Sequence, residues 1–316
     1  MRVEREVRAL ALDRPVLAIG AFDGVHLGHR ALLARMRRLA HDEGRPSAVV
    51  TFFPPGKVLF QGVPFLASEA EKLQLLGTYA PEAVAMIPFT RAYARTDPAT
   101  FLGELASLHP SAIVVGEDFR FGRDRAGGLD DLQHVPERME VFRLLLDGEE
   151  PIKSSRIRDL LAAGDMTEAE RLLGAPYRAH GRVVAGDRRG REIGVPTANV
   201  AVPEGKAMPH GVFAVRVDTP QGRYDGMANV GPRPSFPEGA PSLEANLFDF
   251  AGDLYDQEVT VHFLARLRGQ RRFDGVDDLT RQLALDREAA QAALAGRGDA
   301  GAGASGSPGA DEAAEA

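Results

Sequence analysis

The chain has 316 residues, which is enough for about two domains that each bury a core of their own. Hydrophobic residues make up 44% and charged residues 26%, ordinary values that exclude a collagen-like, coiled-coil or wholly disordered chain. The formal net charge of -7 excludes a general attraction to duplex DNA or to an anionic membrane surface. Any phosphate that the protein binds must therefore be held by a local site.

The chain contains no cysteine, so disulfides, iron–sulfur clusters and thiolate zinc sites are impossible. Metal ligands, if any, must be oxygen or nitrogen atoms. Charges interrupt the first ten residues, where a secretory signal needs an apolar run. No window approaches the about 18 apolar residues of a membrane span. The sequence thus predicts a cytoplasmic protein with neither nucleic acid nor membrane as a partner.

Apolar runs alternate with helical patterns through the first half of the chain. The expected strands are residues 14–22, 47–53, 83–89 and 111–115, and the expected helices are residues 28–40, 68–78, 98–108, 155–161 and 166–173. Nearly continuous apolar strands separated by helices are typical of a parallel sheet covered on both faces. The first domain, residues 1–174, is therefore predicted to be α/β, with Gly174 and Pro176 ending its last helix.

The pattern changes in the second half of the chain. Short alternating or β-branched runs, separated by glycine and proline turns, occupy residues 177–185, 211–218, 223–230, 242–250 and 258–267. Such runs are typical of a small antiparallel β-barrel. A helix over residues 276–294 completes the second domain, residues 177–294. Residues 296–316 lack branched aliphatic and aromatic side chains, so this tail is predicted to be disordered.

A turn rich in glycine and histidine follows the first expected strand. The segment GAFDGVHLGH, residues 20–29, lies at the carboxyl end of a predicted parallel sheet, where ligands of α/β proteins bind. Glycines allow close approach of the backbone, and a helix start offers free N–H groups and a positive dipole end. His26 and His29 can reach the same anion, so the turn is predicted to hold a nucleotide phosphate. An incomplete metal site and a plain turn are the alternative interpretations.

The turn resembles the G-x-F-D-G-x-H-x-G-H signature of the HxGH nucleotidyltransferases. The segments VVGEDFRFGRDRAG, residues 114–127, and IKSSRIRDLLAAGD, residues 152–165, resemble further blocks of the bifunctional riboflavin kinase/FAD synthetase family of prokaryotes. Taken alone, the serine pair in the second segment would be a simple helix cap. The resemblance covers about residues 10–292, and it implies that the first domain transfers an adenylyl group from ATP to FMN.

The resemblance also implies roles for matching positions in the first domain. His26 and His29 would contact the ATP phosphates and stabilise negative charge as the adenylyl group moves. The implied nucleotide and flavin contacts are Gly20, Phe22, Asp23, Gly24, Gly116, Asp118, Phe119, Ser154, Ser155, Arg156 and Arg158. Because the phosphate of FMN is already anionic, the reaction needs positioning and charge neutralisation rather than a general base.

One segment departs from the family pattern. The family usually carries T-F-x-P-H-P after its second strand, whereas this chain reads TFFPPG, with Pro55 and Gly56 in place of the His and the second Pro. If that histidine contacts flavin or phosphate, adenylyl transfer is weakened here; if the segment only shapes a loop, it is not. The alternative function is therefore a riboflavin kinase whose first domain binds nucleotide with weak or no adenylyl transfer.

A second group of motifs lies in the barrel-like half. The segments GDRRGREIGVPTAN, PHGVFAV, NVGPRPSF and SLEANLFDF resemble the riboflavin kinase module in order and spacing, although PTAN alone could be a turn. The resemblance implies that Thr197 and Asn199 ligate Mg²⁺ together with ATP oxygens. The implied ATP contacts are Gly186, Arg189, Gly190, Gly194 and Pro196. A hairpin rich in glycine and arginine, followed by hydroxyl and amide oxygens, can neutralise phosphates without a Walker loop.

The resemblance makes Glu244 the general base that accepts the proton of the terminal ribityl hydroxyl of riboflavin, a role that a neutral alcohol nucleophile requires. Strand alternation places Glu244 and Asn246 on one face, so both are expected to line a pocket. The expected products are FMN from the second domain and FAD from the first, with Mg²⁺-ATP used in both steps. A flavin or nucleotide sensor without turnover is the alternative from another class of function. A sensor needs neither a general base nor a metal site, so the implied roles of Glu244, Thr197 and Asn199 argue against it.

Overall fold

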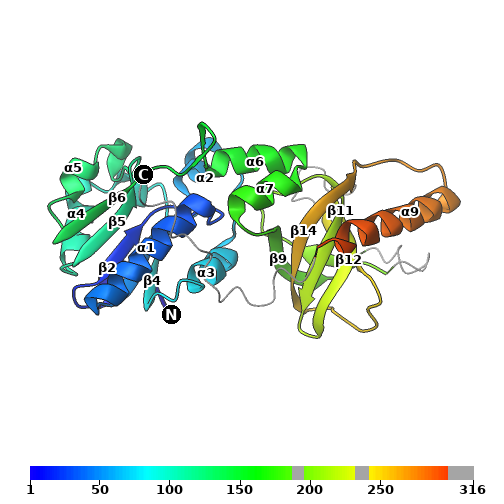
Figure 1. Ribbon diagram of the computed structural model, residues 1–316, viewed down its shortest axis with the longest axis horizontal. Coiled ribbons are helices and arrows are strands. Elements are labelled where there is room, and N and C mark those ends of the chain that lie inside the picture. Colours follow the sequence, from blue (N-terminus) through cyan, green and yellow to red (C-terminus); the bar gives the residue numbers. More distant parts are fainter. Residues whose placement is uncertain (187–195, 232–241, 298–316) are drawn as a thin grey trace. The chain divides into compact units, whose positions relative to one another are not determined.

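A computed structural model describes residues 1–186, 196–231 and 242–297 (Figure 1). The chain forms two compact units, which divide between Ser154 and Ser155. The sequence predicted a domain boundary further along, at Gly174. Two helices that the sequence assigned to the first domain pack with the second unit instead. They are α6 (Ser154–Ala163), apart from its first residue, and α7 (Met166–Leu173). The assignment of residues 1–174 and 177–294 to two functional domains remains a prediction.

The first unit is built on a six-stranded sheet in which all neighbouring strands are parallel. In spatial order the strands are β1 (Arg2–Glu4), β4 (Ala83–Pro88), β3 (Ser47–Phe53), β2 (Val16–Ile19), β5 (Ala112–Gly116) and β6 (Arg138–Phe142). The α/β class with a parallel sheet is thereby confirmed. The sequence missed β1 and β6, which are the partly exposed edge strands and lack continuous apolar runs.

Helices and short turns surround this sheet. They are α1 (Leu27–Glu43), α2 (Gly56–Gln61), α3 (Glu69–Gly77), α4 (Pro98–Ala106), α5 (Leu129–Leu132), the 3₁₀ turns η1 (Arg8–Leu10), η2 (Tyr93–Arg95) and η3 (Arg123–Arg125), and the hairpin of β7 (Leu146–Asp147) and β8 (Glu150–Pro151). Local chemistry sets where they begin. At the start of α4, the Asp97 carboxylate accepts a hydrogen bond of 2.9 Å from the N–H of Ala99, and Pro98 occupies the first helical position.

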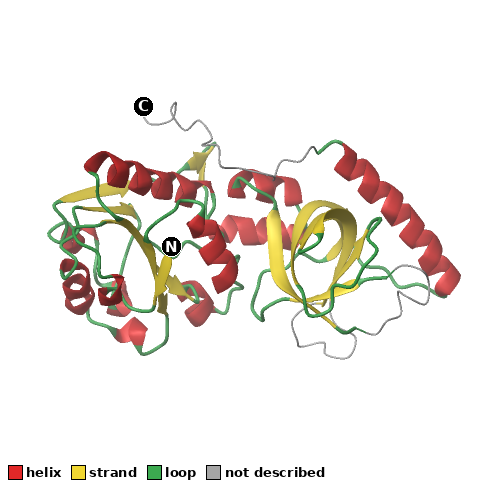
Figure 2. Ribbon diagram, turned by 90° about the horizontal axis from the view of Figure 1, so that it is seen from below, coloured by secondary structure: helices red, strands yellow, loops and turns green. Residues whose placement is uncertain are grey.

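Both faces of the sheet are covered, as the sequence predicted (Figure 2). Successive strand residues point to opposite faces, so one strand contributes to two cores. On one face Leu17 of β2 joins a buried cluster that contains Phe101 of α4. On the other face its neighbour Val16 joins a cluster that contains Met36 of α1. This double burial holds the strand ends, and the loops that follow them, in fixed positions.

The second unit is a closed six-stranded antiparallel barrel with a helix packed on it, which confirms the second half of the predicted fold. Around the barrel the strands are β10 (Ala198–Ala201), β13 (Ser242–Leu247), β12 (Gly222–Gly231), β11 (Gly211–Thr219), β14 (Glu258–Arg268) and β9 (Tyr177–Val184). The helix is α9 (Val276–Ala295), drawn in orange to red in Figure 1. The predicted disordered tail lies outside the described residues from residue 298 onward.

Apolar packing and a buried ion pair fasten α9 to the barrel. Ala290 and Leu294 pack with Met227 and other apolar side chains of the barrel. Beside them, the Arg268 guanidinium forms three hydrogen bonds, of 2.9, 3.1 and 2.7 Å, to the Asp286 carboxylate, whose side chain is only 4% exposed. A buried carboxylate is costly unless it is paired, so this ion pair fixes how α9 lies on the strands. Within the described ranges, no helix has both the length and the hydropathy needed to cross a membrane.

Replacing Asp286 by alanine leaves the Arg268 charge without its carboxylate at a site where the arginine side chain is only 22% exposed. We expect the free energy of unfolding to fall by about 3 kcal/mol, measured by urea denaturation followed by circular dichroism. Asp249→Ala is the matched control, because Asp249 likewise pairs with an arginine, Arg287 of α9, but its side chain is 87% exposed. Its effect should stay below about 1 kcal/mol. Equal losses for the two variants would contradict the role of the buried pair.

Candidate active sites

The turn between β2 and α1 has an unusual backbone. Phe22, Gly24 and Val25 have positive φ angles of 44°, 81° and 45°. Such angles are easy for glycine but strained for other residues. The sequence predicted a strand that continues to Phe22, but β2 ends at Ile19, before this turn. Strained backbone persists only where surrounding contacts hold it, and it clusters at functional sites.

Neighbouring segments hold this turn from two sides. The Asp23 carboxylate, 3% exposed, accepts hydrogen bonds from the backbone N–H groups of Leu66 (2.8 Å) and Ala67 (3.4 Å). The Ser154 hydroxyl donates to the Asp23 carbonyl oxygen at 2.9 Å. Phe22 is buried in the core against α1. Three predicted ligand contacts, Phe22, Asp23 and Ser154, therefore make contacts within the protein that shape the turn.

The structure brings His26 and His29 together, as their spacing predicted. Their rings stack with centroids 3.6 Å apart and an interplanar angle of 20°, and the edge of Phe22 supports His29 at 5.3 Å. His26 is the N-cap residue of α1, and its side chain makes no capping hydrogen bond. The Nδ1 atoms of both rings are buried, and no group in the described residues forms a hydrogen bond with them. Two polar rings thus lie at the positive end of a helix dipole.

Burial sets the charge of both rings. Loss of solvation lowers the pKa of His26 to about 4, and burial lowers the pKa of His29 well below its usual value, helped by the charges of His26 and Lys72. At neutral pH the rings are therefore neutral and offer N–H donors rather than fixed positive charges. An anion at the start of α1 would accept from such donors and favour protonation of the rings.

The remaining predicted residues of this region come from several elements. Gly20 follows β2 and Gly116 ends β5, and because β2 and β5 are parallel neighbours the two glycines lie at the same edge of the sheet. Asp118 is exposed in the turn after β5, and Phe119 is half-buried and stacks on Phe121 with ring centroids 5.6 Å apart. Ser155, Arg156 and Arg158 follow on α6, in the second compact unit.

The TFFPPG segment starts a short helix. Pro55 is the N-cap residue of α2, and Gly56 is its first residue. The helix presents Phe60, which is 56% exposed and lies edge-on to Phe89, with ring centroids 6.5 Å apart. Phe89 contacts Tyr93 in turn, at 5.9 Å. This aromatic group was not predicted from the sequence, because Phe60 is about thirty residues away from Phe89 and Tyr93 in the chain. The available signal was Phe60, which lies just after the TFFPPG segment that departs from the family pattern.

In the second unit, strand register assembles the predicted kinase residues. Glu244 of β13 pairs with Asn199 of β10 on one side and with Asn229 of β12 on the other. Residues directly opposite each other in a sheet share a face, so the three side chains form a row. Gly186 lies against the Asn199 amide, and a Cβ atom there would overlap it. Pro196 and Thr197 are exposed just before β10. Arg189, Gly190 and Gly194 lie outside the described residues.

Asn246 has a structural contact of its own. The sequence placed it on the same face as Glu244; it is buried, and its Nδ2 donates a 2.7 Å hydrogen bond to the Pro196 carbonyl oxygen. It therefore anchors the segment that precedes Thr197. The sequence did not single out Asn229, which begins the NVG motif and lies opposite Glu244; its Oδ1 accepts a 3.2 Å hydrogen bond from Gln270 Nε2.

A metal in the second unit would need oxygen donors of a particular kind. In the parts of the chain that the structure describes, no three His, Cys, Asp or Glu side chains gather closely enough to hold an ion. Thr197 and Asn199 offer hydroxyl and amide oxygens, and hard cations such as Mg²⁺ take oxygen ligands and usually share them with substrate phosphates. These residues fit a metal that arrives with a nucleotide.

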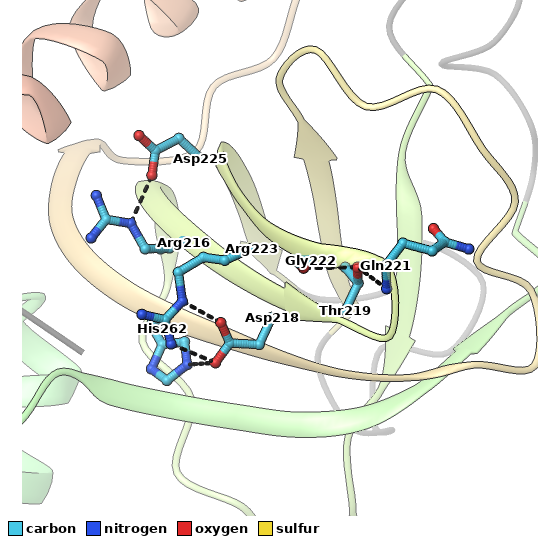
Figure 3. A network of polar contacts seen from close by, with 8 residues as sticks. All are labelled: Arg216, Asp218, Thr219, Gln221, Gly222, Arg223, Asp225 and His262. Atoms are coloured by element: carbon cyan, nitrogen blue, oxygen red, sulfur yellow. Dashed lines mark hydrogen bonds and ion pairs between the residues drawn. The ribbon is translucent and has the colours of Figure 1, made fainter. Parts of the chain in front are cut away.

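One pocket among the described residues lies away from this row. A pocket of about 900 Å³ adjoins the β11–β12 hairpin and the end of α9. Charged residues that line it form ion pairs (Figure 3): Asp218 binds Arg223 at 2.5 Å, and Arg216 donates to Asp225 at 2.8 Å. Asp218 also binds His262 of β14 at 2.9 Å. The hairpin is at the opposite end of β12 from Asn229. This paired network stabilises the hairpin and is separate from Glu244.

Comparison with known proteins identifies the chain's relatives. A model of the FAD synthetase family matches residues 10–156, and a model of the riboflavin kinase family matches residues 173–294. Bifunctional riboflavin kinase/FMN adenylyltransferases from Pseudomonas fluorescens and Bacillus subtilis are 38% and 34% identical to it. The alignments cover 92% and 88% of this chain, and 97% and 92% of those proteins.

The chain belongs to the bifunctional riboflavin kinase/FMN adenylyltransferase family. Its solved relatives include a Streptococcus pneumoniae structure described as a macrolide-efflux protein, with a TM-score of 0.80 and 30% identity over 92% of this chain and 98% of that one. That likeness supports the fold of the family, and the description concerns the other protein. The resemblance inferred from the motifs is thereby confirmed.

Anion binding at the start of α1 should change the titration of His26. We expect tripolyphosphate to raise the pKa of His26 from about 4 towards the usual histidine range, because a nearby anion stabilises the protonated ring. NMR of the histidine ring protons from pH 3 to 8, with and without tripolyphosphate, measures the shift, and His26→Gln assigns the signal. A titration that tripolyphosphate leaves unchanged would show that the anion does not bind beside this ring.

Proposed function

We propose that this bifunctional riboflavin kinase and FMN adenylyltransferase divides its two activities between its units. Adenylyl transfer belongs to the turn between β2 and α1, and the kinase reaction belongs to the row around Glu244. The observation that carries the proposal is that each unit matches its own family and supplies a group suited to its reaction: stacked neutral imidazoles at a helix start in one, and a carboxylate beside Asn199 in the other.

In the first unit, a phosphate oxygen of FMN attacks the α-phosphorus of ATP, and the bond to the β-phosphate oxygen breaks to release pyrophosphate. The attacking group is already charged, so no base is needed. His26 and His29 donate N–H hydrogen bonds to the phosphates, and the first backbone N–H groups of α1 add to them. The exposed ring of Phe60 and its neighbour Phe89 offer a surface on which a flavin ring can pack.

In the second unit, Glu244 takes the proton from the terminal ribityl hydroxyl of riboflavin as that oxygen attacks the γ-phosphorus of ATP. ADP leaves with the electrons of the broken phosphate bond. Thr197 and Asn199 would hold Mg²⁺, which neutralises phosphate charge when bound. Asn246 keeps this segment close to β13 through its bond to Pro196, so that the nucleotide and the base meet. ATP in the cytoplasm supplies both steps.

Purified wild-type protein, incubated with riboflavin and Mg²⁺-ATP, should form FMN first and then FAD, separated by liquid chromatography with fluorescence detection. The order follows because the product of the second unit is the substrate of the first. Removal of Mg²⁺ with EDTA should stop both steps. FMN without any FAD would contradict adenylyl transfer and support the kinase-only alternative; bound flavin without either product would support the sensor.

Separate substitutions should remove the two activities independently. Glu244→Gln should lower FMN formation at least about a hundredfold, because the hydroxyl loses its base, while FAD synthesis from supplied FMN stays normal. His26→Ala with His29→Ala should show the converse, with FAD synthesis about a hundredfold slower. The rate of FMN formation from riboflavin and the rate of FAD formation from supplied FMN, measured for each variant, test this prediction.

Glu258→Gln is the control for the kinase base. Glu258 is a half-exposed carboxylate of the same barrel that pairs with His180 and Arg182. Its replacement should leave both rates within about twofold of wild type. Normal FMN formation by Glu244→Gln would remove Glu244 from the role of base.

A further inference from the structure

Lys72 is a buried cation next to the candidate adenylyl transfer site. It lies in the first turn of α3 and is 0% exposed. Its Nζ donates hydrogen bonds to the carbonyl oxygens of Ala21 (2.8 Å) and Phe52 (2.9 Å). Ala21 belongs to the turn that leads into α1, and Phe52 lies near the end of β3. One ammonium group thus ties together the carboxyl ends of two neighbouring strands.

The start of α3 is itself rigid, which makes Lys72 an effective tie. Ser68 and Glu71 form a reciprocal capping box: the Ser68 hydroxyl accepts from the N–H of Glu71, and the Glu71 carboxylate accepts from the N–H of Ser68. The residues just before this cap donate to Asp23. The turn is therefore held at Ala21 by Lys72 and at Asp23 by the segment that leads into α3.

Hydrogen bonding alone does not require a lysine at this place. Thr51, a neutral residue of β3, already donates to the same Ala21 carbonyl oxygen at 3.3 Å. A fully buried ammonium is costly, since burial lowers the pKa of Lys72 to about 8 against the opposing charges of Asp23 and Glu69. Its positive charge reaches the nearby ring, because it contributes to the low pKa of His29. A charge that acts on His29 also acts on an anion bound there.

We propose that Lys72 is a positioning residue for adenylyl transfer, which fixes the turn carrying His26 and His29 and places a positive charge behind the bound triphosphate. This inference rests on the proposed function of the first unit. Lys72 donates to backbone carbonyl oxygens and acts on the substrate through the turn and through its field. The groups that face it are Asp23, Glu69 and His29.

The first test is the pH dependence of FAD synthesis. In wild-type protein, kcat/KM for ATP should fall above about pH 8, where the free enzyme loses the Lys72 charge. Lys72→Met should lower kcat/KM for ATP at least tenfold at pH 7 and should remove the fall above pH 8. Lys72→Arg should restore part of the rate and move the fall to higher pH, because arginine stays protonated.

Two controls separate this effect from loss of structure or of overall charge. FMN formation, which depends on the other unit, should be unchanged in Lys72→Met and reports the amount of intact protein. Lys57→Met removes an exposed lysine of α2 and should leave the pH profile unchanged. A profile that is identical in wild-type and Lys72→Met proteins would overturn the inference, while FAD formation by the wild type would still support the proposed function.

A second measurement uses the wild-type protein, so it does not depend on whether a variant folds. The chain contains four lysines, so NMR of protein carrying ¹³C-labelled lysine gives few signals to assign. Tripolyphosphate should raise the pKa of Lys72, because a bound anion stabilises a nearby cation. A purely structural lysine would titrate identically with and without the anion, and that result would overturn the inference. Failure of the wild type to form FAD at any pH would refute the proposed function and this inference together.

Discussion

The conformation of the turn between β2 and α1 depends on two buried charged residues, Asp23 and Lys72, which form hydrogen bonds to the backbone. A backbone with positive φ at Phe22, Gly24 and Val25 is unfavourable unless neighbouring segments hold it. Asp23 and Lys72 provide that hold with opposite charges, one accepting from backbone N–H groups and the other donating to carbonyl oxygens. The placement of the two imidazoles at the start of α1 follows from this arrangement.

The two units meet the same electrostatic problem with different means. Under the proposed function, each would stabilise the negative charge of a nucleotide in a protein whose net charge is itself negative. For this purpose the first unit offers a helix start, neutral imidazoles and a buried ammonium. The barrel uses a row of oxygen-bearing side chains around Glu244, suited to a cation that arrives with the nucleotide. The difference matches the nucleophiles, because a phosphate needs no base and a hydroxyl does.

The packing of each unit explains why these groups stay in place. Parallel strands buried on both faces cannot shift without disturbing two cores at once, so their carboxyl ends keep a fixed edge. In the barrel, closure leaves no free strand edge, and register places Asn199, Glu244 and Asn229 side by side. The Arg268–Asp286 pair then fixes α9 on the barrel surface.

The sequence by itself determined the fold class and the proximity of His26 and His29, because strand and helix periods and a compact motif are local properties of the chain. It also brought Glu244 and Asn199 into consideration through motif resemblance. Only the tertiary structure decided that Asn246 anchors Pro196, that Asn229 adjoins Glu244 and that Lys72 binds Ala21 and Phe52. These contacts join residues far apart in the chain, and edge strands such as β1 have too little apolar pattern to be recognised. Long-range pairing is set by packing and register, which no short stretch of sequence encodes on its own.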